Sequence, residues 1–386
     1  MKRLRRAGFF FFVVSALTVL RVEACASRDD AESRYAYVAE RIQRHQLPGL
    51  APGHPFDGEW TLIAISEAVA SSVQLAVRHP ERRETYARNA SDWARLLASP
   101  EVRAYDTKQW GSDPLTTLGT LDAHVGYLGH VALAMDAGCL LGGERDEPLH
   151  DEIVNALARR FSESERGLLE TYPAETYLPH NLVAMAGIAQ YDACVGSSRH
   201  RQLIDAWLAK VKKHWLDDGV LVFAPGQPAR GSGAAWNSFY LPLIDEAFAA
   251  DQSERMWTKF GDTAVGGWLG ELREWPVGVD REGDVDSGPL VFGISPSATG
   301  YALGDAVLRG RPIAGSIIRN AELTGVTLGD RYVLSPFVGD AITLASRTAT
   351  RWPTKPMHVD KVSNTLLVPS GLHARPRTAV ARTSSR

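Results

Sequence analysis

Acid–base side chains gather where an apolar segment of the chain begins. The stretch TYPAETYLPHN, residues 171–181, leads into the apolar run LVAMAGIAQYDACVG. A helix start needs one capping side chain, so this many polar groups at the entrance of a buried helix indicates a second purpose. Imidazole, carboxylate and phenol groups can exchange protons with a bound molecule. The stretch contributes Tyr172, Glu175, Tyr177, His180 and Asn181 as candidate site residues.

Four further segments carry polar and aromatic residues at comparable places. They are HPFDGEW, QWGSDPLTTLGTLDAHVGYLGH, GAAWNSFY and DVDSGP. Carboxylates, imidazoles and phenols with tryptophans between them indicate an acid–base site for a small or ring-shaped substrate. The candidates that they add are Asp57, Glu59, Trp110, Tyr127, His130, Trp236, Asn237, Tyr240, Asp284 and Asp286.

We predict proton transfer by His130 and His180, with Glu175 or Asp286 as the carboxylate partner, and substrate binding by the other candidates. Each has a structural alternative. Glu175 can favour a helix N-terminus through the helix dipole, and His180 can be a packed, hydrogen-bonded histidine. Asp286 or Ser287 can cap the helix expected after them.

Spacing limits two other interpretations. Asp284 and Asp286 are two residues apart, so an extended segment would point them to opposite sides, with at most one facing the site. His124 and His130 are six apart and cannot share a helical face as a metal-binding pair would. We therefore expect neither a metal nor a cofactor.

Two kinds of helix alternate along the chain and must position these residues. An amphipathic set is expected near 31–45, 84–97, 150–164, 199–212, 252–267 and 312–323. A more apolar set is expected near 59–77, 121–139, 176–193, 236–249, 288–306 and 336–348. Half-exposed helices that alternate with buried ones imply two layers. The pattern predicts an all-α fold, an (α/α)6 toroid of six inner and six outer helices, with a solenoid of helix pairs as the alternative.

The links between these helices differ in length. Links that follow inner helices are mostly short, whereas those that follow outer helices are long, as at 98–120, 165–175, 213–235 and 268–287. In a ring of antiparallel pairs the two kinds of link lie at opposite ends. Long loops on a rigid scaffold commonly carry function, so we expect the site where inner helices start.

The chain as a whole has the composition of a globular protein. It has 386 residues, 45% hydrophobic, with a formal net charge of -3. We expect one toroid domain over 27–360, a C-terminal tail over 361–386, a small-molecule substrate and no nucleic-acid partner. An oligomer is left open.

The first 26 residues resemble an export signal. Basic residues precede an uncharged run from Ala7 to Leu20, and Ala24-Cys25-Ala26 follows. An N-terminal anchor helix is the alternative. The segment also resembles a lipoprotein signal, so we expect an exported, periplasmic protein or an outer-membrane lipoprotein attached through a lipidated Cys25. Cys139 and Cys194 end successive inner helices, and both a disulfide and two separate thiols are compatible with that placement.

Three segments together resemble the linalool dehydratase–isomerase-like family of exported α/α toroids, over roughly residues 59–348. They are Tyr127-Leu128-Gly129-His130-Val131, the stretch 171–181 with the apolar run after it, and the glycine-rich segment after Asp284-Val285-Asp286. The resemblance implies the fold, export and a pocket histidine at His130. The two pocket cysteines of the family correspond to Thr171 and His180 here, so the thiol chemistry on terpene alcohols is not expected.

These observations favour an enzyme of lyase or isomerase type that dehydrates, hydrates or isomerises an alcohol. A carbohydrate-active enzyme, either glycoside hydrolase or polysaccharide lyase, is the alternative. It predicts Asp57 or Glu59 facing Asp284 or Asp286 at about 5–10 Å. A third interpretation is a binding module with an inert pocket.

Overall fold

The computed structural model describes residues 2–47 and 56–357, and this part of the protein is mostly helical. The predicted all-α character is confirmed, with short β-hairpins as an addition, while the predicted tail at 361–386 lies outside the described residues. The helices are α1 (Lys2–Ala26), α2 (Ala31–Gln43), α3 (Asp57–Arg78), α4 (Arg83–Leu97), α5 (Pro100–Trp110), α6 (Val125–Leu140), α7 (Glu147–Glu163), α8 (Leu178–Val195), α9 (Arg201–His214), α10 (Gly231–Tyr240), α11 (Glu246–Phe260), α12 (Pro296–Leu308), α13 (Ile313–Thr324) and α14 (Phe337–Thr348).

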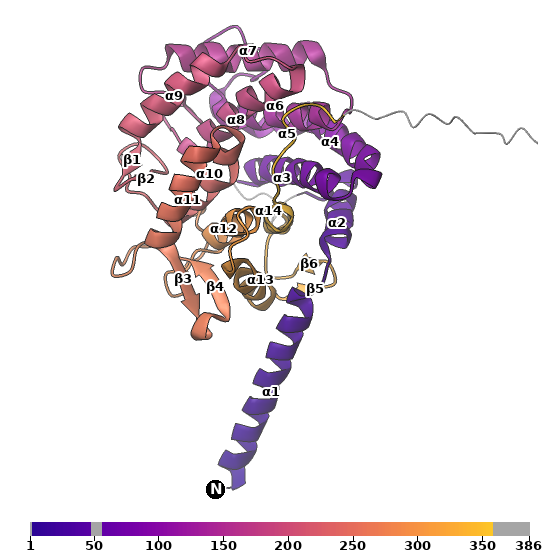
Figure 1. The fold of residues 1–386 in the computed structure, drawn as a ribbon, viewed down its shortest axis with the longest axis vertical. Coiled ribbons are helices and arrows are strands. Elements are labelled where there is room, and N and C mark those ends of the chain that lie inside the picture. Colours follow the sequence, from indigo (N-terminus) through magenta and orange to yellow (C-terminus); the bar gives the residue numbers. More distant parts are fainter. Residues whose placement is uncertain (1, 48–55, 358–386) are drawn as a thin grey trace, which may run out of the picture.

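The apolar helices pack in a cycle at the centre of the molecule (Figure 1). Helix α3 contacts α6, α6 contacts α8, α8 contacts α10, α10 contacts α12, α12 contacts α14, and α14 contacts α3 again. The amphipathic helices α2, α4, α7, α9, α11 and α13 lie outside this cycle, each against one or two inner helices. Burying one apolar face of each helix in this way stabilises both layers.

Helices α6 and α8 approach each other closely because small residues face the contact. A methyl group placed on Gly129 would lie 2.8 Å from the backbone nitrogen of Ala184, and one on Gly187 would lie 3.1 Å from Cβ of Ala132. Only hydrogen fits at Gly129 without a shift of one helix. The contact therefore fixes the spacing of the two helices that carry His130 and His180.

Two predicted inner helices start at other residues than expected. Helix α6 begins at Val125 rather than 121, because His124 has a left-handed backbone (φ 45°) that ends the preceding loop. Helix α10 spans Gly231–Tyr240 rather than 236–249. Pro242 stops it and Asp245 caps the next helix by accepting a hydrogen bond from the Phe248 N–H.

The helices predicted at 252–267 and 288–306 also have other boundaries in the structure, and a β-hairpin lies between them. Helix α11 ends at Phe260, and a hairpin of β3 (Gly261–Ala264) and β4 (Leu269–Leu272) follows, turning at Gly266 and Gly267. Helix α12 begins at Pro296. Its cap is Ser295, which accepts from the Ala298 N–H, so the prediction that Asp286 or Ser287 caps this helix is wrong.

The long link after α4 contains a helix that the sequence analysis missed. Helix α5 carries ordinary boundary signals: Ser99 caps it, Pro100 is its first residue and left-handed Gly111 ends it. The links after α9 and α13 contain the small hairpins β1 (Leu216–Asp217) with β2 (Val220–Leu221) and β5 (Thr327–Leu328) with β6 (Arg331–Tyr332). Long links after outer helices thus hold structure of their own.

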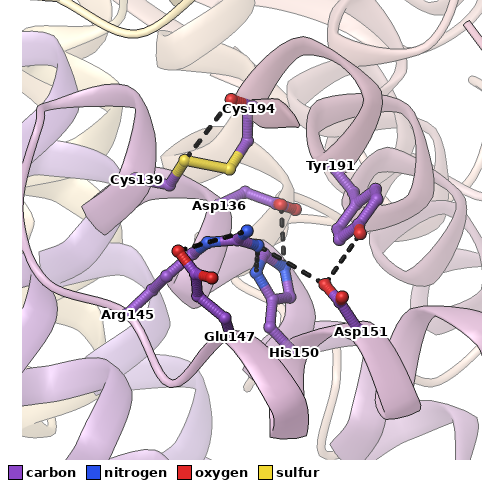
Figure 2. Close-up of a disulfide and its surroundings, with 8 residues drawn as sticks. All are labelled: Asp136, Cys139, Arg145, Glu147, His150, Asp151, Tyr191 and Cys194. Carbon is purple, nitrogen blue, oxygen red and sulfur yellow. Dashed lines mark hydrogen bonds and ion pairs between the residues drawn. A yellow bond between two sulfur atoms is a disulfide. The ribbon is translucent and has the colours of Figure 1, made fainter. Parts of the chain in front are cut away.

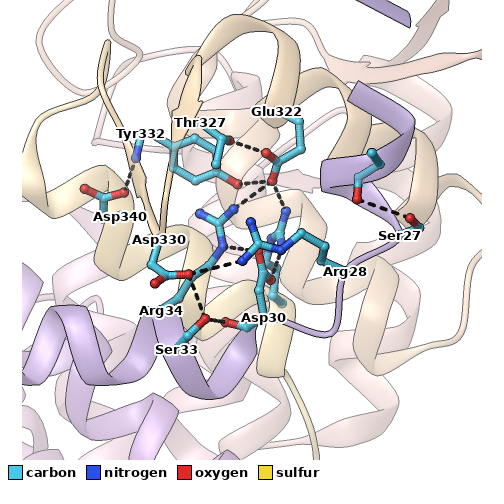
Figure 3. A network of polar contacts seen from close by, with 12 residues as sticks. Ser27, Arg28, Asp30, Ser33, Arg34, Glu322, Thr327, Asp330, Tyr332 and Asp340 are labelled. Atoms are coloured by element: carbon cyan, nitrogen blue, oxygen red, sulfur yellow. Dashed lines mark hydrogen bonds and ion pairs between the residues drawn. The ribbon is translucent and has the colours of Figure 1, made fainter. Parts of the chain in front are cut away.

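A buried ion-pair network joins α2 to α13 and α14 (Figure 3). Arg34 donates to Asp30 at 2.7 Å and to Glu322 at 2.9 Å, and Arg347 donates to Asp30 at 2.7 Å and to Glu322. The Tyr332 hydroxyl also donates to Glu322 at 3.1 Å. We call these five residues the closure network, because they connect α2, near the start of the body, to α13 and α14, the last two helices.

Helix α1 projects from the body and packs against α13 at its C-terminal end (Figure 1). Glu23 accepts hydrogen bonds from the Trp268 indole and from Arg319, and Val22 is fully buried. By length and hydropathy α3 could cross a membrane, but most of it is buried in the body, as expected for a core helix.

Candidate functional site

His130 lies at the centre of a buried polar cluster. It projects from α6, is fully buried, and its Nδ1 lies 2.8 Å from Oγ of Ser66 on α3. Its ring centroid is 5.9 Å from that of His180 and 6.4 Å from that of Tyr240. Burial, and secondarily the neighbouring His180, lowers the pKa of His130 well below its usual value. The imidazole is therefore neutral at neutral pH.

His180 pairs with a carboxylate on a neighbouring helix. Its Nε2 lies 3.3 Å from Oε1 of Glu59, which is in the first turn of α3. The Tyr172 hydroxyl also donates to Glu59, and burial followed by the Glu59 charge raises the pKa of Tyr172. The indole of Trp236 covers another side of His180, with ring centroids 5.1 Å apart. The structure thus brings Glu59, Tyr172, His180 and Trp236 together.

Glu67 is a member of the cluster that the sequence analysis missed. It is fully buried, and its Oε1 accepts hydrogen bonds from the hydroxyls of Tyr240 at 2.6 Å and Tyr301 at 3.2 Å. Burial raises the pKa of Glu67 to about 7, against the lowering effect of both tyrosines. A group of this kind can donate a proton at neutral pH. The sequence feature that could have identified Glu67 is its position as a lone carboxylate inside an apolar helix, two turns after Glu59 and on a similar face.

Several buried polar atoms of the cluster have no hydrogen-bond partner among the described residues. A buried polar atom without a partner costs roughly 1–3 kcal/mol, so such atoms favour the binding of water or a small polar molecule. These atoms are Nε2 of His130, Nδ1 of His180, Oε2 of Glu67, Nε1 of Trp236 and both amide atoms of Asn237.

A second acidic group surrounds the buried Arg230, which precedes α10. Its guanidinium pairs with Asp284, with Asp286 at 3.3 Å and with the fully buried Glu274 at 3.4 Å. The prediction that Asp284 and Asp286 point apart is wrong, because the segment forms a turn in which Asp284 Oδ1 accepts from the backbone N–H groups of Asp286 and Ser287.

Asp286 is close enough to the central cluster to feel its charges. Its pKa is raised to about 6, chiefly by burial and then by the negative charges of Asp284 and Glu59, while Arg230 and His180 act in the opposite direction. Asp286 therefore belongs to the Arg230 group, and the charges of Glu59 and His180 act on its protonation. It remains a candidate proton carrier at the edge of the site.

Four of the predicted site residues hold the surrounding loops in place. Asn181 accepts from the Leu169 N–H and donates to the carbonyls of Leu169 and Tyr177, which ties the 169–177 loop to α8. Tyr127 donates to the Leu97 carbonyl. Glu175 lies on an exposed turn, where it accepts from the Tyr177 hydroxyl at 2.8 Å. The structure does not place Glu175 in the buried cluster.

Asp57 and Trp110 lie on the α5 side of the site. Asp57, in the first turn of α3, lines a surface cavity of about 250 Å³ together with Tyr105 of α5. The Trp110 indole donates to the Thr171 carbonyl at 3.2 Å and lies 4.4 Å from the ring of His124, centroid to centroid. His124 in turn bonds Asp106 at 2.6 Å, with both side chains fully buried. These contacts hold the loop before α6 against the 171–177 segment.

One group outside the central cluster has metal-ligand chemistry. In the part of the chain that the structure describes, Asp136, His150 and Cys194 place their ligand atoms within 4.8 Å of one another. This group lies at the opposite ends of α6 and α8 from the central cluster.

The sequence matches no protein-family model and no curated protein.

Proposed function

We propose that the chain is an (α/α)6 toroid enzyme that uses acid–base chemistry on a small organic molecule in the central cluster. The cycle of contacts from α3 to α14 and back to α3, with an amphipathic helix beside each inner one, supports this architecture. The resemblance to linalool dehydratase–isomerase-like proteins supports it too. The functional proposal depends on the grouping of His130, His180 and Glu67, the last joined to His130 through Tyr240. Each has one buried hydrogen-bonding atom without a partner among the described residues.

Dehydration of an alcohol is the reaction that these groups suit best. In the proposed step, Oε2 of protonated Glu67 donates its proton to the substrate hydroxyl, which leaves as water. Nε2 of neutral His130 takes the proton from the adjacent carbon, and the electron pair of that C–H bond forms the C=C bond. Exchange of one proton at each residue with solvent restores the enzyme. The reverse sequence is hydration, and re-addition at another position is isomerisation.

The other members of the cluster position the substrate. The Glu59 carboxylate holds His180 through Nε2, which leaves Nδ1 to bind the substrate. Trp236 stacks on Tyr301 with ring centroids 5.5 Å apart and provides a flat apolar wall. Because the residues that correspond to the family's pocket cysteines are Thr171 and His180, we propose that imidazole and carboxylate groups replace thiol chemistry in this chain.

The test is turnover of a panel of small tertiary and allylic alcohols, with alkene products measured by gas chromatography. His130→Ala and Glu67→Gln should each lower kcat/KM by about 10²–10⁴-fold, the usual contribution of a positioned acid or base. His200→Ala is the matched control, because His200 is a buried histidine paired with Asp192 away from the site. The proposal would be refuted if the wild type turned over a substrate and both site variants kept that activity.

Glycoside hydrolysis is the second candidate, because a specific observation favours it. The negative charge of Glu59 contributes to the raised pKa of Asp286, so the charge of one carboxyl group acts on the protonation of the other at the edge of the cluster. Such a pair can act as acid and base on a glycosidic bond. Release of nitrophenol from aryl glycosides, lost in Asp286→Asn and retained in His130→Ala, would select this candidate over dehydration.

We also propose that the protein is exported through its N-terminal segment, to the periplasm or as a lipoprotein attached through Cys25. Fractionation of cells that express the native chain should place the protein in the periplasm, membrane or medium. A main species that is cytosolic and begins at Met1 would refute export. Cys25→Ser should release membrane-bound protein if the anchor is a lipid, whereas unchanged attachment would point to α1 itself.

A further inference from the structure

The C-terminal ends of α6 and α8 meet α7 at a buried group that the proposed function does not use (Figure 2). Cys139 of α6 and Cys194 of α8 form a disulfide, with Cα atoms 5.8 Å apart. Of the two arrangements compatible with the sequence, the structure has the bridge rather than two separate thiols. Asp136 lies one helical turn before Cys139 and therefore on the same side of α6.

Asp136 and His150 point at the bridge from two helices. Both side chains are fully buried, and Nε2 of His150, on α7, lies 2.9 Å from Oδ1 of Asp136. The two groups are partners in this ion pair, and apart from it neither oxygen of Asp136 nor Nε2 of His150 has a hydrogen-bond partner within the described residues. Together with Sγ of Cys194 these atoms lie within 4.8 Å of one another. A buried carboxylate and a buried imidazole are thus aimed at the same place as the sulfur atoms.

We propose that reduction of the Cys139–Cys194 disulfide converts this group into a zinc-type site for a divalent cation. Its ligands are the two thiolates, Nε2 of His150 and the Asp136 carboxylate. Zn²⁺ takes thiolate, imidazole and carboxylate ligands, and its structural sites are four-coordinate and tetrahedral. The oxidised chain has the covalent bridge at this place, and the reduced chain has the metal.

The chemistry balances with a dithiol as the reductant. The dithiol supplies two electrons and two protons, which break the S–S bond and give two thiols, and it becomes a disulfide itself. The cation then binds as the two thiols lose their protons. With Zn–S bonds of about 2.3 Å in tetrahedral geometry, the sulfur atoms must stand about 3.8 Å apart. Rotation of the two cysteine side chains provides this change without moving the helices.

Arg145 must also change its contacts when the cation binds. Its Nη1 donates to Nδ1 of His150 at 3.0 Å, so Nδ1 carries the lone pair and Nε2 the proton. Metal binding at Nε2 moves that proton to Nδ1, which then opposes Arg145. Nη2 of Arg145 already lies 3.8 Å from Oε1 of Glu147, and Nη1 lies 3.6 Å from Oδ1 of Asp151. The arginine can therefore turn toward these carboxylates. Arg145→Gln should therefore tighten binding.

The experiment uses the full-length chain, reduced with dithiothreitol and freed of it by gel filtration without oxygen, with Co²⁺ as the probe. One Co²⁺ per chain is expected, with the visible absorption of a tetrahedral ion and a thiolate-to-cobalt charge-transfer band, both removed by Zn²⁺. The oxidised chain should show neither. Loss of an outer partner alone costs 10–100-fold in affinity, so His150→Ala and Asp136→Asn should each weaken binding by at least about tenfold.

His200→Ala is the control, since His200 forms a similar pair with Asp192 at 2.9 Å but has no cysteine in its group. Thermal unfolding of each variant confirms that it is folded, and Asp136→Asn keeps the volume of the side chain. Binding of Co²⁺ by the oxidised chain, absence of binding by the reduced chain, or equal affinities of His150→Ala and His200→Ala would each overturn the proposal.

Discussion

The closure network and the central cluster are both buried and polar, yet they are built in opposite ways. In the closure network two carboxylates, Asp30 and Glu322, meet two guanidinium groups (Figure 3). In the central cluster Glu67 accepts hydrogen bonds from two tyrosine hydroxyls, and among the described residues no arginine or lysine pairs with it.

The difference separates structural support from chemistry. Paired charges in a dry interior stay ionised and hold their helices together, because removal of one partner leaves a buried charge uncompensated. Burial raises the pKa of Glu67 to about 7, so this carboxyl group can change its protonation state near neutral pH. We therefore expect substitutions in the first region to affect stability and those in the second to affect pH dependence and turnover.

The largest effect on stability is expected for Arg34→Met. This change leaves Asp30 and Glu322 with Arg347 as their remaining cation, and breaking a buried pair costs about 3–5 kcal/mol. Urea unfolding should show a loss of that size. Arg44→Met is the control, because Arg44 forms an exposed pair with Glu40 that contributes less than about 1 kcal/mol. Equal losses of unfolding free energy in both variants would show that the closure network does not stabilise the fold more than an exposed ion pair does.

Glu67→Gln should change how stability depends on pH. The pKa of Glu67 is about 7 in the folded chain against an ordinary 4.5, so between these values the folded state binds more protons and stability falls as pH rises. The difference corresponds to on the order of 3 kcal/mol at pH 8. The variant should therefore gain stability over the wild type above pH 7 and match it below pH 4.5. Glu144→Gln, at an exposed residue, should show no such crossover.

Gly129→Ala tests whether the spacing of α6 and α8 matters for the cluster. The added methyl group would lie within 3 Å of the Ala184 backbone, and overpacking of this kind costs about 1–3 kcal/mol. Turnover should fall as well, since His130 is the next residue. A variant with wild-type stability and activity would mean that the two helices can separate freely. Gly315→Ala, on α13, where the nearest atom to an added methyl group lies 3.9 Å away, controls for loss of a helical glycine in general.

The smallest effect is expected for Glu175→Gln. The side chain is exposed and bonds only the Tyr177 hydroxyl among the described residues, so unfolding free energy should stay within about 0.5 kcal/mol and kcat/KM within a few-fold. A loss comparable to that of Glu67→Gln would return Glu175 to the catalytic role predicted from the sequence.

Helical periodicity was enough to predict the alternation of two helix types, because it depends on burial alone. Boundaries were harder where a local signal competed with the apolar pattern. Pro242 and Asp245 end one helix and begin the next inside a continuous apolar run, and Ser295 caps α12 well after the first apolar residues. The β3–β4 hairpin begins directly after α11, with no loop between them. We therefore predicted its first strand as the end of the helix.

The members of the candidate site could be predicted from the sequence in part, because polar residues at helix starts stand out and those inside apolar helices do not. His130, His180 and Glu59 lie near the starts of inner helices, where polar residues stand out. Glu67 lies in the middle of α3, and its partners Tyr240 and Tyr301 come from helices far along the chain. The packing of the inner helices brings Glu67, Tyr240 and Tyr301 together. Their spacing in the sequence does not predict this contact.

The disulfide between Cys139 and Cys194 makes the intervening chain a closed covalent loop. The exposed turn at 173–175, where Ala174 has a left-handed backbone, lies inside that loop. Exposed turns are where proteases cut first. A cut there would put His130 and His180 on different polypeptides, yet the bridge would keep the two fragments in one molecule, with each histidine still on a helix that is tied to its neighbour.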